Sequence, residues 1–201
     1  MVIDGLYYAL GLVAGGVVVS WLARPAWGIP LFLLALFCLW FFRDPEREIP
    51  AGDVAVAPAD GKVVAVRKEE PDLTRISIFL NIFDVHVNRS PIAGTITDVR
   101  YQPGKFLVAS REEASAENEM NTITVEGGGT RVVLKQIAGL IARRVICWKQ
   151  PGDQVATGER IGYIKFGSRT DVLLGPEWEV VAVEGSRVSA GSSVIARRRK
   201  G

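Results

Sequence analysis

A serine directly after a glycine, the only histidine and an aspartate in a turn are the residues whose types point to covalent chemistry. Ser168 follows Gly167 in "YIKFGSRTDVLL", His86 lies in "NIFDVHVNRSP", and Asp60 lies in "APADGKVVAV". A serine becomes a nucleophile when a histidine takes its proton and a carboxylate orients that histidine. The sequence therefore predicts a catalytic set of Ser168, His86 and Asp60.

The Gly167-Ser168 pair predicts chemistry on the backbone of the chain itself. The G-x-S-x-G motif of many serine hydrolases is absent here, because Arg169 and Thr170 follow the serine. Glycine tolerates strained dihedral angles and leaves its carbonyl unhindered, so Ser168 Oγ can attack the carbonyl of Gly167. The amide then becomes an ester, and β-elimination leaves dehydroalanine, which hydrolyses to a pyruvoyl group. His86, oriented by Asp60, is the candidate base for both proton transfers.

Simpler interpretations of the same residues remain open. A Gly-Ser turn between strands is common, and Asp60 before a glycine fits a hairpin turn. A membrane serine hydrolase that keeps Ser168 intact is an alternative function. Asp84 and Asp171 are alternative carboxylates for His86.

Alternation around His86 predicts a strand. In this strand His86 and Asp84 face one side, and Phe83, Val85 and Val87 face the other.

The rest of the chain predicts a mainly β domain that positions these residues. From about Gly52 onward, short runs rich in Val, Ile, Thr and aromatic residues are separated by Gly, Pro and Asp turns, which is typical of a compact β sandwich or barrel-like domain. The pattern G-x-x-V-x-x-G-x-x-[IV] occurs at Gly152–Gly162 and Gly185–Ile195, and "GDVAVAPADGKVV" is a looser copy. This pattern predicts duplicated hammerhead-type hairpins.

Biotinyl and lipoyl carriers share that pattern, but neither Met1 nor Met120 flanks a lysine, which disfavours a carrier. A non-enzymatic, membrane-anchored β adaptor remains an alternative.

The N-terminal region predicts a helical hairpin in the membrane. Apolar runs at about Ile3–Leu22 and Ala26–Phe42 flank Arg24, and each is long enough to span a bilayer. A cleaved signal peptide is disfavoured, because "MVIDG" has no basic residues. We expect a hairpin over residues 1–43 and a catalytic β domain over residues 44–201. Basic residues after the second run favour the cytoplasmic side of the cell membrane for the β domain.

No metal is expected. The two cysteines, Cys38 and Cys147, lie in separate runs and make no metal cluster with the single histidine. The formal net charge of the 201 residues is only +2, and we expect no nucleic-acid partner. The basic end "ARRRKG" is consistent either with contact to anionic lipid or with a disordered tail.

Several separated motifs together resemble a known family. The segments "FFRDPERE", "VAPADGKV", "NIFDVHVNRSPIAGTI", "YQPGKF", "NEMNT" and "IGYIKFGSRTDVLL" resemble, in this order, the short membrane-associated phosphatidylserine decarboxylases of bacteria and archaea. The resemblance implies cleavage between Gly167 and Ser168, giving a β chain of residues 1–167 and an α chain of residues 168–201. Ser168 would become the covalent pyruvoyl cofactor.

The resemblance implies an enzyme of phospholipid biosynthesis. It would convert phosphatidylserine in the membrane to phosphatidylethanolamine and CO₂, with Asp60, His86 and Ser168 as the catalytic set; a homo-oligomer is left open. Two positions depart from longer bacterial relatives, which carry a second histidine where Phe83 stands and Thr or Ser where Arg169 stands. Short members resemble this chain at both. From charge alone, Arg89 and Arg169 are candidates for binding the lipid phosphate or carboxylate.

Overall fold

The computed structural model describes residues 1–69, 72–105, 117–139, 144–165 and 167–199. The chain divides into two compact units, Met1–Glu46 and Arg47–Gly201.

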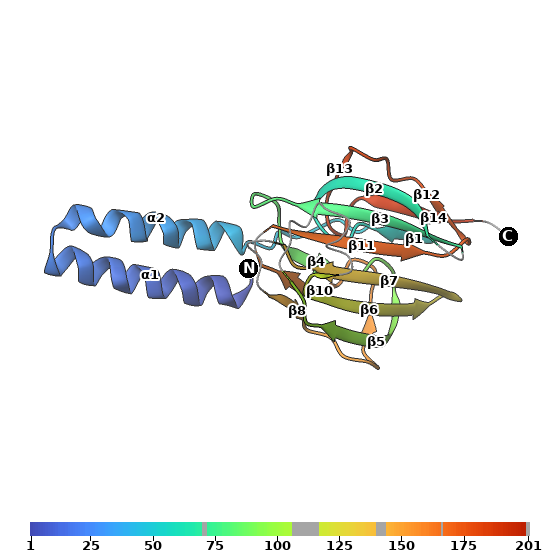
Figure 1. Ribbon diagram of the computed structural model, residues 1–201, viewed down its shortest axis with the longest axis horizontal. Helices are drawn as coiled ribbons and strands as arrows, with labels where there is room; N and C mark the ends of the chain where they lie inside the picture. Colours follow the sequence, from blue (N-terminus) through green and yellow to red (C-terminus); the bar gives the residue numbers. More distant parts are fainter. Residues whose placement is uncertain (70–71, 106–116, 140–143, 166, 200–201) are drawn as a thin grey trace. The chain divides into compact units, whose positions relative to one another are not determined.

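The first unit is a pair of antiparallel helices, α1 (Ile3–Leu22) and α2 (Pro25–Phe41), as predicted (Figure 1). The helices approach closely at small residues, because a Cβ at Gly28 would lie 2.0 Å from Ser20 Oγ and 2.6 Å from the Gly16 carbonyl oxygen. Such small residues let apolar helices pack where no polar contacts hold them. By length and composition α1 can cross a membrane, whereas α2 is a shorter apolar helix of 17 residues.

The second unit consists of three antiparallel sheets. The large sheet has the order β13-β2-β3-β11-β7-β6-β5-β9, and two smaller sheets have the orders β4-β10-β8 and β1-β14-β12. The strands are β1 (Val54–Val56), β2 (Gly61–Glu69), β3 (Leu73–Leu80), β4 (Val87–Arg89), β5 (Gly94–Gln102), β6 (Met120–Gly127), β7 (Thr130–Ile137), β8 (Val145–Cys147), β9 (Gln154–Val155), β10 (Arg160–Ile164), β11 (Ser168–Leu174), β12 (Trp178–Val180), β13 (Arg187–Val188) and β14 (Val194–Arg198). The predicted mainly β fold is confirmed.

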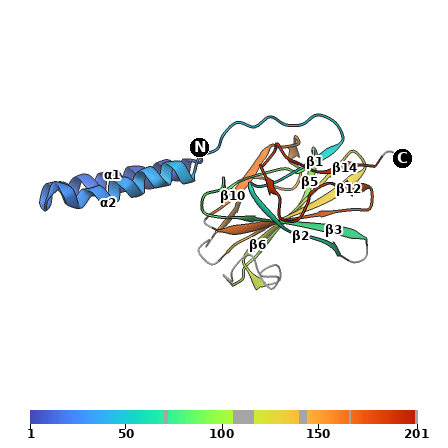
Figure 2. The same ribbon diagram turned by 90° about the horizontal axis from the view of Figure 1, so that it is seen from above.

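One apolar core joins the large sheet to the β1-β14-β12 sheet. Figure 2 shows β1, β14 and β12 across from β2 and β3. Ala55 and Ile195 of the small sheet belong to the same buried cluster as Val63, Ile78 and other residues of the large sheet. In a β-strand every second side chain faces the same side of the sheet. The side chains that face inward therefore fill the space between the curled sheets.

The repeated sequence pattern folds twice in the same way. In each copy a glycine turn leads to a two-residue strand, a second glycine turn and a longer strand, here β9–β10 and β13–β14. The turn glycines have positive φ in both copies: 99° at Gly152, 74° at Gly158, 90° at Gly185 and 77° at Gly191. Only glycine adopts these angles without strain, which is why the pattern is visible in the sequence.

One local prediction was wrong, and one open alternative is narrowed. No strand passes through Phe83, because the Asn81 side chain accepts a hydrogen bond from Phe83 N at 2.7 Å and Asp84 accepts one from Asn81 N at 2.9 Å. These contacts form a turn that delays the strand until Val87. For the basic end, the alternative of a disordered tail does not apply to Ala196–Arg198, because these residues of β14 pair with β1 and β12.

Candidate active site

Ser168 is the first residue of β11, at the centre of the large sheet. It lies opposite Leu80 of β3, and its neighbour Arg169 lies opposite Ile137 of β7. The Ser168 side chain is 0% exposed and faces the core side, as Val172 does two pairs further along the strand. Among the described residues, Ser168 Oγ has no hydrogen-bond partner. A buried hydroxyl without a partner is costly and therefore marks a site whose chemistry needs explanation.

Gly167 precedes this serine in a left-handed backbone conformation. Its φ is +56°, a region that other residues enter at a cost of roughly 1–2 kcal/mol. A Cβ built on Gly167 would meet nothing within 4 Å among the described residues, so the space beside its Cα is open. The turn thus has one property expected for attack by Ser168, a backbone conformation that glycine permits.

His86 comes directly before β4 and is almost fully buried, with 3% of its surface exposed. Its Nδ1 lies 2.9 Å from the Asp84 carbonyl oxygen. Its own carbonyl accepts a hydrogen bond from Ile164 N at 3.2 Å. Ile164 ends β10 and is followed after three residues by Ser168, so the histidine borders the segment that leads into β11.

The contacts of β4 tie the segment after His86 to the large sheet. Asn88, two residues after His86, accepts a hydrogen bond from Gln136 Nε2 of β7 at 2.8 Å. Gln136 is the register partner of Thr170 in β11. Ile164 at the end of β10 donates its N–H to the His86 carbonyl, which further ties His86 to the neighbouring strands. That the His86 and Ser168 side chains meet stays a prediction, and Ser168 lies at the end of the large sheet where β11 begins.

Asp60 lies at this end as well. It precedes Gly61, whose close approach to the Phe79 carbonyl places the start of β2 beside the end of β3. Its carboxylate accepts hydrogen bonds from Arg47 Nη2 at 3.0 and 2.8 Å and from Ala190 N at 2.8 Å. Within the described chain these bonds do not reach His86, and the orientation of His86 by Asp60 stays a prediction.

The sequence did not predict Arg47 as a partner of Asp60. The two residues are 13 positions apart and belong to different loops, and the only signal was an arginine in the segment "RDPERE".

The other two carboxylates have partners of their own. Asp84 pairs with Arg187 and accepts the backbone N–H of Asn81. Asp171 faces the opposite side of β11 from Ser168 and pairs with Arg169, whose Nε lies 2.9 Å from Asp171 Oδ1. Asp84 also contacts His86, through its backbone oxygen.

The two arginines considered for the lipid headgroup make internal contacts. Arg89 donates to the Gly158 carbonyl at 3.0 Å, and Arg169 is bound to the buried Asp171. Their role toward the lipid stays a prediction, and these contacts use part of their hydrogen-bonding capacity.

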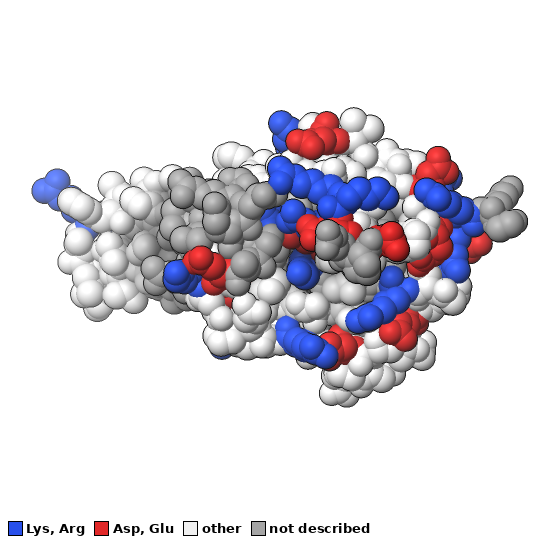
Figure 3. All heavy atoms as spheres, turned by 45° about the vertical axis from the view of Figure 1, so that its right-hand side comes forward, with Lys and Arg blue, Asp and Glu red and all other residues white. Residues whose placement is uncertain are grey.

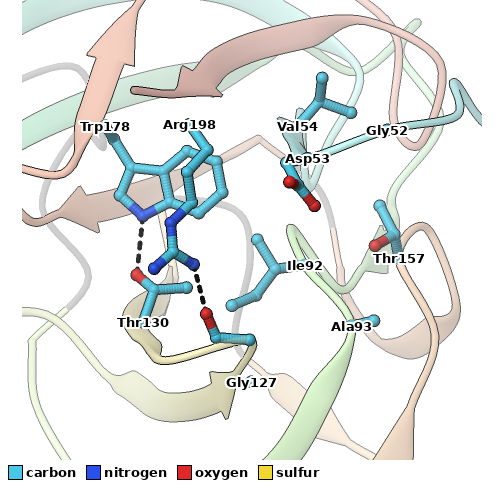
Figure 4. A pocket seen from close by; sticks show the side chains of 11 residues that line it. Gly52, Asp53, Val54, Ile92, Ala93, Gly127, Thr130, Thr157, Trp178 and Arg198 are labelled. Carbon is cyan, nitrogen blue, oxygen red and sulfur yellow. Dashed lines mark hydrogen bonds between the residues drawn. The ribbon is translucent and has the colours of Figure 1, made fainter. Parts of the chain in front are cut away.

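A cavity of about 190 Å³ lies at the opposite end of the large sheet (Figure 4). It is lined by Thr130, where β7 begins, whereas Ile137 at the other end of β7 pairs with Arg169. Trp178 Nε1 donates to Thr130 Oγ1 at 2.9 Å, and Arg198 donates to the Gly128 carbonyl at 2.6 Å. The polar groups of its wall therefore bind one another, away from Ser168.

Charges on the face toward the C-terminus are mixed in sign. Figure 3 shows basic and acidic side chains side by side there, and three pairs in the domain are Arg75–Glu69 at 2.7 Å, Arg100–Asp98 at 2.8 Å and Arg131–Glu126 at 3.8 Å. The Arg100–Asp98 and Arg131–Glu126 pairs are exposed and contribute little to stability. The charges on this face do not form a single-sign surface.

Comparison with known proteins identifies the family. The model of the phosphatidylserine decarboxylase family matches residues 34–196. The chain is 68% identical to a phosphatidylserine decarboxylase proenzyme of Solibacter usitatus, over 98% of this chain and 97% of that protein. It is 47% identical to a proenzyme of the same description from Nitrosomonas eutropha, over 98% of this chain and 94% of that protein. The chain therefore belongs to the phosphatidylserine decarboxylase family.

Proposed function

We propose that this enzyme cuts itself between Gly167 and Ser168, converts Ser168 to a pyruvoyl group and decarboxylates phosphatidylserine to phosphatidylethanolamine and CO₂. The observation that carries the proposal is the buried Ser168 hydroxyl without a partner among the described residues, directly after a glycine with a φ of +56°. The proenzyme descriptions of both relatives support a precursor that is processed.

The self-cleavage reaction uses residues of this chain alone. His86 takes the proton of Ser168 Oγ, which attacks the Gly167 carbonyl carbon, and the amide nitrogen of Ser168 leaves to give an ester. Removal of the Ser168 α-proton then expels the Gly167 carboxylate by β-elimination and leaves dehydroalanine at position 168. Tautomerisation and addition of one water release ammonia and leave the pyruvoyl group on the chain that begins at residue 168.

Position 168 suits such a group, because it is fully buried beside Leu80 and the pyruvoyl group is no larger than serine. Once formed, the pyruvoyl carbonyl supplies an electron sink for loss of CO₂ from an amine-linked substrate. The chain's own contribution is to exclude water around residue 168 and to hold a proton on His86. The apolar helices α1 and α2 would keep the enzyme at the membrane that contains its lipid substrate.

Intact mass spectrometry of the purified protein tests the proposal. We expect two chains, residues 1–167 and a smaller chain from residue 168 whose blocked N-terminus resists Edman degradation. Ser168→Ala should give one uncut chain, because the nucleophile is gone. A single uncut wild-type chain with full decarboxylase activity would contradict the mechanism.

A serine hydrolase is the second candidate, supported by the same buried Ser168 hydroxyl. It predicts that a fluorophosphonate labels intact Ser168. The pyruvoyl enzyme has no hydroxyl at this position, so the wild-type protein should remain unlabelled.

A further inference from the structure

His86 directly precedes β4 of the β4-β10-β8 sheet, whereas Ser168 begins β11 of the large sheet, and side-chain amides join these two sheets. Gln136 of β7 in the large sheet donates from Nε2 to Asn88 Oδ1 of β4 at 2.8 Å. The same Nε2 lies 3.4 Å from the Ile146 carbonyl oxygen of β8. One amide of the large sheet thus contacts two of the three strands in the sheet that carries His86.

The Gln136 amide is held in turn by its neighbour. Asn121 Nδ2 of β6 donates to Gln136 Oε1 at 3.3 Å, and the two residues are register partners. All three amide side chains are buried, with Asn88 and Gln136 fully so. A buried amide lowers the stability of the fold unless it is hydrogen-bonded. In a series of hydrogen-bonded amides, each side chain is held in one orientation by its neighbours.

The layer that these amides form is next to residue 168. Thr170 is the register partner of Gln136 and faces the same side of the sheet as Ser168. Asn88 Nδ2 and Thr170 Oγ1 are buried and have no hydrogen-bond partner within the described residues. Unpaired buried donors are rare in folded proteins, so stability alone does not account for this polar layer.

We propose that Asn88 is a positioning residue for self-cleavage. Gln136 fixes the amide of Asn88, and Asn88 fixes β4 against the large sheet. β4 begins directly after His86, so these contacts would hold the His86 imidazole in position for Ser168. Neither amide contacts the reacting atoms. The inference rests on the proposed function, since it assigns His86 the role of base in that reaction.

The first measurement is the rate at which newly synthesised precursor becomes two chains, followed by intact mass. Asn88→Leu removes the acceptor of Gln136 and is expected to slow conversion at least about tenfold, the loss typical of a general base that is out of place. Val132→Ala is the matched control. Val132 lies on the same face of β7 and is buried in the apolar core, so its truncation lowers stability without touching the amides.

The second measurement reads His86 directly. It is the only histidine, so an untagged Ser168→Ala precursor with ¹⁵N-labelled histidine gives one set of imidazole resonances. We expect Asn88→Leu to shift or split these resonances and Val132→Ala to leave them unchanged, because a general loss of stability does not move one folded ring. The Asn88→Leu/Gln136→Leu variant replaces both hydrogen-bond partners by apolar groups. This lowers stability less than leaving one buried partner unpaired, so the double variant provides a folded protein for both measurements.

The outcomes separate the two proposals. Slow conversion with altered His86 resonances supports the positioning role. Conversion of Asn88→Leu at the rate of Val132→Ala, or unchanged His86 resonances, would overturn it while the two-chain wild-type enzyme upholds the proposed function. An uncut wild-type chain would overturn both.

Discussion

At the residue scale, Gly167 and Ser168 combine backbone freedom with a buried nucleophile. Gly167 has a φ of +56° and open space where a Cβ would lie, and Ser168 Oγ is enclosed by the core. The backbone conformation brings the serine into β11 directly after a turn. We therefore expect the proposed self-cleavage to depend on the conformation of this glycine.

We expect Gly167→Ala to slow self-cleavage about tenfold or more while the precursor still folds. The added methyl group meets no atom within 4 Å, but the left-handed conformation costs roughly 1–2 kcal/mol, and relaxation of the turn moves the scissile carbonyl away from Ser168 Oγ. The conversion of precursor into two chains over time is the measurement. Gly152→Ala is the control, since Gly152 also has positive φ and open space but lies in the turn before β9. Equal cleavage rates in both variants would exclude this role for Gly167.

At the element scale, the turn before β10 is held by Glu159. Its Oε1 lies 2.6 Å from Lys149 Nζ and its Oε2 accepts the Ala156 N–H at 2.8 Å. These hydrogen bonds lower the pKa of the Glu159 carboxyl below its ordinary value, and the hydrogen bond from Lys149 has the largest effect. β10 also carries Ile164, which contacts His86. The turn therefore supports the strand that leads to the cleavage site.

The lowered pKa of Glu159 predicts how stability depends on pH. A carboxyl whose folded pKa is depressed contributes stability above its unfolded pKa of about 4.3 and loses it as the pH falls through the folded value. In the Ser168→Ala precursor, Glu159→Gln should cost about half a kcal/mol at pH 7, because the pair is partly exposed, and less below pH ~4. Urea unfolding at both pH values measures this difference.

Glu126→Gln is the control for that experiment, because the Glu126–Arg131 pair is longer, at 3.8 Å, and more exposed. A Glu159→Gln variant that is equally destabilised at both pH values would argue against a charge effect.

At the scale of the whole molecule, the segment from residue 168 onward is interleaved with the rest of the domain. β11 lies between β3 and β7, β14 lies between β1 and β12, and β13 pairs with β2. Ala190 N and the Arg187 guanidinium also bind Asp60 and Asp84. Cutting one peptide bond removes none of these contacts.

We therefore expect the two chains to stay together after cleavage. They should co-elute in gel filtration under native conditions and separate only in a denaturant such as guanidinium chloride. The uncut Ser168→Ala precursor marks the elution position of the intact domain. Release of the small chain in native buffer would contradict the interleaved sheet order.

The two compact units predict separable roles for the hairpin and the β domain. A variant that begins at Arg47 retains the entire apolar core of the β domain and lacks both apolar helices. We expect it to cleave itself and to lose sedimentation with membranes, which fractionation and intact mass measure together. Membrane sedimentation equal to that of the full chain would assign the attachment to the β domain.

The sequence by itself determined features that depend on neighbouring residues. Two apolar runs were sufficient to define α1 and α2, because helix formation and membrane-spanning length are local properties. The repeated glycines predicted the paired hairpins, since positive φ leaves few alternatives to glycine. The types of Gly167, Ser168 and His86 predicted self-cleavage, and this chemistry stays a prediction.

Only the tertiary structure decided which distant residues meet. Asp60 binds Arg47 and Ala190, and Gln136 binds Asn88, across separations of up to 130 residues that leave no local pattern. The strand predicted through Phe83 failed because the side chains of Asn81 and Asp84 hydrogen-bond the backbone of the turn. Side-chain partners depend on how sheets pack and register, which is a property of the whole chain, whereas propensity and backbone freedom belong to single residues.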